Sequence, residues 1–377
     1  MKYKLKDLIQ PISNKFNFAG KSNVIFLNTS DIYDGHISGT KIKPQNLPGQ
    51  AKKSLKNGDI LFSEIRPKNK RFAIVKNIKA EDYVVSTKLM VLRNCNSNIL
   101  DTRYFYFYLT SPIMIRYLQS EAESRSGTFP QITFKDTMAN IEINLPSLFE
   151  QKLVVKRIET ISSEIYINNQ INDNLLELVD TLFDNIIKFS ILYKATINDI
   201  GTIAGGGTPS KRVNAYWNGK IPWITPKDLS ESHLIFTSHG SRFITEYGLK
   251  ESSAILFPKG TVLFSSRAPI GYISIAKNNI STSQGFKSII PNKGYSSEFI
   301  YELLKRETSL IVSEANGSTF KEVSSKRLKA HVINIPSKEK AKYFDNSVIS
   351  IFKLISKHES ENKILKNLKR ILLQKYF

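Results

Sequence analysis

The stretch that decides the fold spans residues 151–189 and reads QKLVVKRIETISSEIYINNQINDNLLELVDTLFDNIIKF. Its apolar residues recur at alternating steps of three and four, which is the heptad spacing of a coiled-coil helix. The seam comprises Ile158, Ile161, Ile165, Asn168, Asn172, Leu175, Val179, Leu182, Ile186 and Phe189. Only two asparagines interrupt it, and a buried amide lowers the stability of such a seam while it fixes register. The sequence therefore predicts one long helix that pairs with another.

The same seam recurs 190 residues later in the chain. It comprises Val348, Ile351, Ile355, His358, Asn362, Leu365, Lys369, Leu372 and Tyr376. The first helical region, 146–194, has 5 basic and 7 acidic residues, and the second, 336–377, has 10 basic and 4 acidic residues. Opposite net charges and similar seams favour antiparallel pairing of the two helices. We expect Asn172 and Asn362 to meet near a pseudo-twofold axis and to set the helix–helix register.

The repeat extends upstream of both helices, which makes it more specific than two amphipathic segments alone. Leu145-Pro146 corresponds to Ile335-Pro336, and the segment 58–63 resembles 260–265. The chain is therefore predicted to be a tandem duplication of one unit, a globular part followed by a long helix. The predicted boundaries are 1–146 for the first globular part, 147–194 for the central helix, 195–336 for the second globular part and 337–377 for the C-terminal helix.

Composition restricts the class of protein. A chain of 377 residues with 41% hydrophobic content is long enough for two cores of ordinary size. The single cysteine, Cys95, excludes a disulfide framework and a thiolate metal cluster. No apolar run approaches the length of a membrane helix. We expect a cytoplasmic protein without a membrane partner.

The net charge of +21 is concentrated in the globular parts. Residues 1–145 include 22 basic and 12 acidic residues, and residues 195–335 include 17 and 10. A protein of this charge most often binds a polyanion, and double-stranded DNA is the first expectation. The alternative is that the lysines only solvate the surface.

The first globular part alternates short β-type runs, such as 23–27, 59–62, 72–75 and 83–86, with Gly, Asn and Pro breakers, before an aromatic-rich helical stretch over 102–119. The densest basic loop is SEIRPKNKR at 63–71, where several cations are placed to contact phosphates and Arg66 to read a guanine edge. A solvated hairpin turn is the alternative for this loop. The DNA-binding candidates in this part are Arg66, Lys68, Lys70, Arg71, Lys88, Arg125 and Thr128.

The second globular part contains the clearest motif. Residues 205–210 read GGGTPS, residues 216–224 read YWNGKIPWI, and Lys227-Asp228-Leu229 follows. This pattern resembles the specificity subunit of type I restriction-modification enzymes, and the first part lacks both the GGTP and the YW motifs. Thr208, Ser210 and Lys211 are expected to contact phosphates, and Arg267 and Gln284 to read base edges. The DNA-binding candidates are Thr208, Ser210, Lys211, Arg212, Tyr216, Lys227, Ser265, Ser266, Arg267, Gln284, Lys287 and Ser318.

The resemblance covers essentially the whole chain and implies an α/β (α+β) fold. Two similar target recognition domains, separated by two long antiparallel coiled-coil helices, would each read one half of a bipartite, asymmetric DNA sequence. Two modification subunits would dock on the chain and methylate adenine with S-adenosylmethionine, and restriction/translocase subunits would add ATP- and Mg-dependent cleavage. Those cofactors would be bound by the partners and not by this chain.

The sequence itself contains no recognisable catalytic motif. There is no NPP tripeptide of an adenine methyltransferase, and Gly20-Lys21-Ser22 lacks the first glycine of a P-loop, since position 15 is lysine. The histidines show no metal-binding spacing. Glu81, Asp82 and Lys88 form only a weak nuclease-like pattern. We therefore expect a non-catalytic subunit.

Two other functions remain open at this point. The chain could be a stand-alone DNA-binding regulator, or a methyltransferase-associated targeting protein without a restriction partner. It could also be a structural coiled-coil spacer whose basic ends bind RNA.

Overall fold

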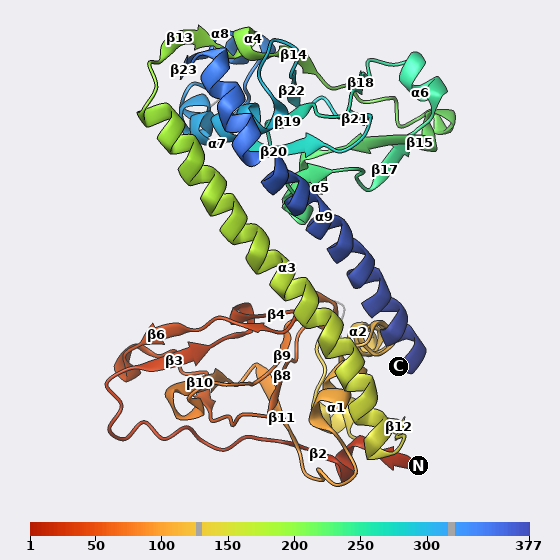
Figure 1. The fold of residues 1–377 in the computed structure, drawn as a ribbon. Coiled ribbons are helices and arrows are strands. Elements are labelled where there is room, and N and C mark those ends of the chain that lie inside the picture. The colour runs from red at the N-terminus through yellow and green to blue at the C-terminus, as the bar shows by residue number, and fades with distance from the viewer. Residues whose placement is uncertain (126–129, 316–320) are drawn as a thin grey trace. The chain divides into compact units, whose positions relative to one another are not determined.

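The computed structural model describes residues 1–125, 130–315 and 321–377, and it divides into two compact units (Figure 1). Unit 1 comprises Met1–Ile165 and Leu365–Phe377, and unit 2 comprises Tyr166–Ile364. The long helices α3 (Leu148–Lys188) and α9 (Lys338–Tyr376) each contribute to both units. Residues 193–196 form a strand, so the central helix ends earlier than the predicted boundary at 194.

Unit 1 contains two four-stranded sheets, coloured red to orange in Figure 1. One has the order β6-β3-β10-β7 and the other β2-β11-β8-β9. Strands β1 and β12 form a separate pair, as do β4 and β5. The bounds are β1 Lys2–Lys4, β2 Ile9–Pro11, β3 Val24–Leu27, β4 Ile32–Tyr33, β5 His36–Ile37, β6 Thr40–Ile42, β7 Ala51–Lys53, β8 Ile60–Ser63, β9 Phe72–Ile74, β10 Tyr83–Ser86, β11 Leu89–Asn94 and β12 Glu142–Asn144.

Unit 2 contains a five-stranded sheet, β14-β22-β19-β20-β16, and a four-stranded sheet, β17-β15-β21-β18. Strands β13 and β23 pair separately. The bounds are β13 Tyr193–Thr196, β14 Thr202–Gly205, β15 Trp217–Ile224, β16 Phe236–Thr237, β17 Arg242–Ile244, β18 Leu256–Phe257, β19 Val262–Ser266, β20 Ile270–Ala276, β21 Ile280–Thr282, β22 Lys287–Ile290 and β23 Val332–Ile335.

The two units share one topology, strand by strand. The order β2-β11-β8-β9 corresponds to β14-β22-β19-β20, and β6-β3-β10-β7 corresponds to β17-β15-β21-β18. Each of the latter sheets has one parallel pair at its centre, β10 with β3 and β15 with β21, and antiparallel pairs at its edges. Register is also repeated, because Ile60 pairs with Ile74 as Val262 pairs with Ile275. The first globular part therefore has the fold of the second although it lacks the second part's motifs.

Shorter helices cover these sheets and complete each core. In unit 1 they are α1 (Thr102–Leu109) and α2 (Pro112–Arg125), and in unit 2 they are α4 (Ile197–Ile200), α5 (Pro226–Ser232), α6 (Glu246–Lys250), α7 (Ser297–Ser313) and α8 (Ser325–Ala330). The helix predicted over 102–119 is interrupted after Leu109, where Thr110 and Ser111 separate α1 from α2. The Asp101 side chain caps α1 by accepting from two backbone N–H groups. Tyr104 and Phe105 are buried in the core of unit 1.

Within unit 2, α3 and α9 run in opposite directions. Asn168 Nδ2 donates to Asn362 Oδ1 over 3.1 Å, and Asn172 Oδ1 lies 2.8 Å from His358 Nδ1. The positions 168 and 358, and also 172 and 362, differ by 190, so the two polar pairs are related by the internal repeat. Asn172 and Asn362 therefore have separate partners, and the expectation that they pair with each other was wrong. The heptad pattern predicted that these polar residues lie in the helix–helix seam, but it did not predict which residue of α3 faces which residue of α9.

Replacing both Asn168 and Asn362 with leucine should raise the thermal stability. The two amides are buried, and each satisfies the other in part, so an apolar pair of similar size removes a desolvation cost. Asn362→Leu alone should lower the free energy of unfolding by about 1–3 kcal/mol, because it leaves the buried Asn168 amide with only its longer, 3.4 Å hydrogen bond to Glu361. Thermal denaturation of the two single variants and the double variant tests this. A double variant less stable than both single variants would contradict it.

Within unit 1, the end of α9 packs into the core of the first repeat. Leu372, Leu373, Tyr376 and Phe377 contact the buried cluster, which also contains Ile158 of α3. The ring centroid of Phe377 lies 4.9 Å from that of Tyr104. Arg157 Nη1 donates to Tyr376 Oη over 2.6 Å. The last turn of the chain is therefore part of the first repeat's core.

Unit 2 contains a half-buried carboxyl that joins α9 to β16. The Glu359 carboxyl accepts from the backbone N–H groups of Ile235 and Phe236 over 2.7 and 3.1 Å. Burial raises the pKa of Glu359 from an ordinary value of 4.5 to about 7, against the opposing effects of those N–H groups and of Lys277. The folded state therefore holds this proton more tightly than the unfolded chain does. Protonated Glu359 therefore makes its full contribution to the free energy of unfolding below about pH 4.5, and this contribution is lost as the pH rises through about 7.

Glu359→Gln should flatten the pH dependence of stability between pH 5 and pH 8. The amide oxygen of glutamine still accepts a hydrogen bond, but the amide does not titrate. The wild-type free energy of unfolding should therefore fall by up to about 3 kcal/mol over this pH range because of Glu359, and the variant should not show this fall. Glu339→Gln, at an exposed position of the same helix, is the control and should keep the wild-type profile. Urea titrations at several pH values measure the effect. Parallel profiles for wild type and Glu359→Gln would contradict it.

Candidate nucleic-acid interface

The predicted basic loop of the first repeat lies where three segments of unit 1 meet. The Glu64 N–H donates to the Lys88 carbonyl over 3.3 Å, and the Arg66 N–H donates to the Pro130 carbonyl over 3.1 Å. The Ile132 N–H donates in turn to the Glu64 carbonyl over 2.9 Å. We call this meeting of residues 64–71, 88 and 130–132 the unit 1 junction.

Unit 2 has the same junction at the corresponding positions. The Ser266 N–H donates to the Gly285 carbonyl over 2.8 Å, and the Val323 N–H donates to the Ser266 carbonyl over 3.0 Å. An isolated antiparallel bridge links Arg267 to Glu322, as another links Ile65 to Gln131 in unit 1. We call the meeting of residues 266–269, 284–286 and 321–323 the unit 2 junction. One backbone arrangement thus presents different side chains in the two repeats.

The unit 1 junction exposes several cations. Arg66 is exposed, with backbone φ 47°, and begins a short 3₁₀ turn. Lys68 lies 3.7 Å from Glu123, and Lys70 lies 3.4 Å from Asp34, and all four side chains are largely in solvent. Exposed ion pairs of this kind contribute at most about 1 kcal/mol each, so phosphates can compete for these lysines. Lys88 is exposed, and Arg71 is half-buried.

The unit 2 junction holds a smaller charged cluster. Arg267 Nη1 lies 3.4 Å from Glu322 Oε2. Burial, and to a lesser extent the charge of Arg267, lowers the pKa of Lys287, while Glu322 opposes the shift. The Lys287 Nζ atom donates to the main-chain carbonyl of Gln284 over 3.4 Å, and Gln284 is exposed. This cluster supplies an arginine, a lysine and an amide within one small area.

The GGGTPS and YW motifs form one structural clamp. Trp223 Nε1 donates to the Gly207 carbonyl over 2.9 Å, and Trp217 Nε1 donates to the Ser210 carbonyl over 3.1 Å. A Cβ atom on Gly207 would lie 2.1 Å from the Ser253 carbonyl oxygen, so only glycine fits beneath the clamp. The two indoles therefore fix the backbone of residues 207–210 and determine how the next residues are presented.

The clamp displays a polar and aromatic surface. Ser210, Lys211 and Arg212 are exposed, and Thr208 is half-buried. The Tyr216 ring is 5.4 Å from the ring of Tyr247. These positions suit phosphate contacts, and their assignment to DNA remains a prediction. Sequence reasoning missed Arg242, whose guanidinium lies 5.5 Å from the Trp217 ring, because β17 is far from the motif in sequence.

Two predicted contacts have a different role. Ser265 and Ser266 are fully buried. The Ser265 hydroxyl donates to the Pro269 carbonyl and accepts from the Tyr272 N–H, and the Ser266 hydroxyl donates to the Gly285 carbonyl. The prediction that these hydroxyls face a ligand is corrected: they hold the loop in shape. The sequence pattern predicted where these serines lie in the loop but not that they are buried.

The remaining candidates are dispersed. Arg125 Nη2 donates to the Asp136 carbonyl over 2.7 Å at the end of α2, and Lys227 is a highly exposed residue of α5, 3.6 Å from Glu231. Thr128 and Ser318 lie outside the described residues. Over residues 1–125, 130–315 and 321–377, no group of three or more His, Cys, Asp or Glu side chains is arranged to hold a metal ion. In the same ranges, no helix has the length and hydropathy required to span a bilayer.

A known protein-family model matches both halves of the chain. The model of the type I restriction modification DNA specificity domain matches the chain twice, at residues 1–177 and 193–370. The chain belongs to this family. The predicted resemblance and the tandem repeat are thereby confirmed, since each match covers one globular part and most of one long helix.

Individual relatives agree with this membership. The specificity subunit of the type I restriction enzyme HindI from Haemophilus influenzae is 29% identical over 98% of this chain and 97% of its own length. The specificity subunit of the type I restriction enzyme MjaIX from Methanocaldococcus jannaschii is 46% identical over 48% of this chain and 42% of its own length. A crystal structure of a type I restriction-modification S subunit from M. genitalium has a TM-score of 0.62 at 14% identity, covering 100% of this chain and 96% of that one. At this low identity, the structural similarity to the M. genitalium subunit indicates a shared fold only.

If Arg267 or Gln284 reads a base edge, its replacement by alanine should act at one base pair. The expected loss is about 1–3 kcal/mol for the preferred base at that position, with binding to other bases there nearly unchanged. Binding to a library randomised at each position measures this, and Lys250→Ala, at an exposed position of α6 that is not a predicted DNA contact, is the control. Uniform weakening across all sequences would instead identify the residue as a phosphate contact.

Proposed function

We propose that the chain is the DNA-recognition subunit of a type I restriction-modification enzyme, with each unit reading one half of a bipartite, asymmetric target. The observation that carries the proposal is the junction, which is repeated in both units on one backbone but with different side chains. A duplicated scaffold with unlike side chains suits two unlike half-sites. α3 and α9 would act as an antiparallel coiled-coil spacer that fixes the unspecified gap.

The same proposal places catalysis in partner subunits. Two modification subunits would use S-adenosylmethionine to methylate adenine, and restriction/translocase subunits would hydrolyse ATP with Mg²⁺. Family membership supports these partners. Both long helices also expose large apolar side chains that suit protein docking. They include Phe149, Tyr166, Ile167, Tyr343 and Ile364, each more than half exposed.

Co-purification tests the proposal. Tagged chain, expressed in its source organism, should bring down a methyltransferase in stoichiometric amount, and the complex should transfer methyl groups to duplex DNA and not to RNA. The isolated chain should bind the same DNA without transferring methyl groups. A chain that binds DNA specifically but recovers no methyltransferase would be a stand-alone regulator. Preference for RNA would contradict both functions.

A further inference from the structure

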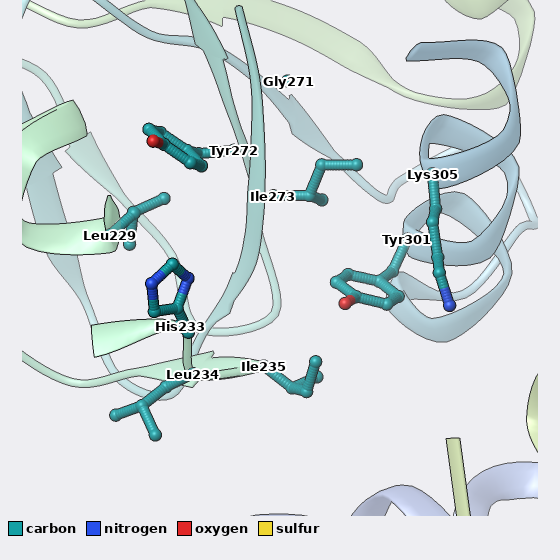
Figure 2. Close-up of a pocket in the computed structure, with 9 residues that line it drawn as sticks. All are labelled: Leu229, His233, Leu234, Ile235, Gly271, Tyr272, Ile273, Tyr301 and Lys305. Atoms are coloured by element: carbon teal, nitrogen blue, oxygen red, sulfur yellow. The ribbon is translucent and has the colours of Figure 1, made fainter. Parts of the chain in front are cut away.

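Unit 2 contains a cavity of about 200 Å³ beside β20, and its lining is drawn in Figure 2. On one side lie Leu229 of α5, and His233 and Leu234, which follow that helix. On the other side lie Tyr301 and Lys305 of α7. Gly271, Tyr272 and Ile273 of β20 lie between them, with Ile235 at one end.

The cavity lies at an open sheet edge. β16 pairs with β20 only opposite Ile275 and Ala276, and the Ile275 N–H donates to the Ile235 carbonyl over 2.7 Å. Since main-chain groups alternate in direction along the regular part of a strand, Ile273 points to the same side as Ile275. The main-chain groups of Ile273 therefore face the cavity beyond the end of β16, a position at which another strand or turn can add.

A tyrosine hydroxyl also points into the cavity. The Tyr301 side chain comes from α7, and its oxygen is directed at the space between the two walls (Figure 2). Most of the Tyr301 side chain is buried, but its hydroxyl oxygen keeps contact with solvent, and it has no hydrogen-bond partner among the residues that the structure describes. This hydroxyl can therefore bond a polar group that enters the cavity.

In the first repeat, β9 corresponds to β20, and another segment of unit 1 covers its edge. Tyr106 and Tyr301 each lie five residues after the N-cap of their helices, α1 and α7. Phe72 of β9 pairs with Phe62 of β8 as Ile273 pairs with its partner in β19. Phe72 and Tyr106 are thus the counterparts of Ile273 and Tyr301.

The covering element in unit 1 is the Asp34-Gly35 turn between β4 and β5. The Gly35 N–H donates to the Phe72 carbonyl over 2.9 Å, and the Asp34 N–H donates to the Lys70 carbonyl over 2.8 Å. A Cβ atom on Gly35, whose φ is 93°, would lie 3.2 Å from the Tyr106 hydroxyl. A tight turn with glycine at its tip therefore fills this position in the first repeat.

We propose that the unit 2 cavity is a docking slot for a glycine-centred tight turn of a protein partner, which adds its main chain to the free edge of β20. The turn's N–H groups donate to the Ile273 carbonyl, and its glycine lies over the Tyr301 hydroxyl. Among its described residues, the second repeat has no such turn here, because α5 occupies the corresponding part of the chain, which reaches the β20 edge at Ile235. Binding by strand addition supplies main-chain hydrogen bonds, and the apolar walls select the flanking side chains.

The chain's own turn provides the probe. A lactam-cyclised peptide of residues 31–38 is titrated into full-length protein labelled at isoleucine and leucine methyls, and methyl spectra are recorded. We expect shifts at Leu229, Ile235 and Ile273, with a dissociation constant on the order of 1 mM, which such spectra detect. A peptide with Gly35→Val should bind at least about tenfold more weakly, because its Cβ meets the tyrosine hydroxyl and its backbone avoids positive φ.

Two controls distinguish specific docking of the peptide from nonspecific binding. Ile74 of β9, at the covered edge of unit 1, should not shift. Ile273→Pro keeps the carbonyl but places a ring carbon where a main-chain N–H faced the cavity, so it should block close approach of the turn and abolish the shifts at Leu229 and Ile235. The other methyl signals report whether this variant folds. No shifts at the three cavity methyls, equal binding of the Gly35→Val peptide or equal shifts at Ile74 would each overturn the proposal. Methyltransferase co-purification is independent of all these readouts.

Discussion

The fragment of residues 1–194 should dimerise in solution. In the full chain, Leu372, Leu373 and Tyr376 of α9, and Phe377 after it, pack against the core of unit 1. The fragment lacks them, but the repeat offers replacements 190 positions earlier. These are Leu182, Phe183, Ile186 and Ile187 of a second copy. An antiparallel pair of α3 helices would bury these residues around a twofold axis, with Asn168 of one copy facing Asn172 of the other.

Sedimentation of both halves of the chain tests this expectation. Fragment 1–194 should be dimeric at micromolar concentration, and with modification subunits it should methylate a symmetric site. Fragment 195–377 must pair two helices of net charge +6 and place Lys369, whose pKa burial already lowers, in both seams. It should associate more weakly, and salt should strengthen it. A monomeric 1–194 fragment would contradict the two-unit account.

Replacing Arg66, Lys68, Lys70 and Arg71 with alanine should produce the largest loss of DNA affinity. Each phosphate contact contributes about 0.9 to the slope of log K against log salt. Loss of four contacts should lower that slope by up to about 3.6, and affinity at low salt by several orders of magnitude. These side chains are exposed or half-buried, so the fold should survive.

Binding of non-cognate duplex over a range of salt concentrations measures both quantities. The matched control removes Lys2, Lys4, Lys6 and Lys135, four exposed lysines of the same unit. It lowers the net charge equally but leaves the junction intact. Equal slopes for the two variants would show that general charge, and not the junction, binds DNA.

The sequence predicted the features that depend on local pattern. The heptad and its recurrence predicted both long helices, and short β-type runs at 23–27, 59–62, 72–75 and 83–86 correspond to β3, β8, β9 and β10. The basic loop was predicted from its charge alone, and its residues are indeed largely at the surface. Periodicity and charge are properties of neighbouring residues, so they can be read without the fold.

Other features depend on contacts between distant residues. The junction forms because Glu64, Lys88 and Ile132 meet, and nothing in their local sequence indicates this. The heptad located the asparagines but could not show that Asn172 faces His358, since register depends on both helices. Ser265 has the chemistry of a phosphate ligand, yet its hydroxyl is used by the loop itself.

The shared topology also explains a motif difference between the repeats. Unit 2 fixes residues 207–210 with two tryptophans, whereas unit 1 has no tryptophan in its sequence. Both units nevertheless keep the same strand order, because sheet pairing and buried aliphatic residues do not require the clamp. The topology of the first repeat therefore forms without the clamp, whereas in unit 2 Trp223 also belongs to a buried apolar cluster.

The central claim is that each repeat reads its own half of one target. Its most direct test is a map of methylated adenines in cells that carry the chain with its modification subunits, either wild type or with the Arg267→Ala and Gln284→Ala changes. The account predicts a bipartite, asymmetric motif with a fixed gap, in which the variant relaxes one half-site and leaves the other half-site and the gap unchanged. A contiguous motif, or relaxation of both halves at once, would contradict it.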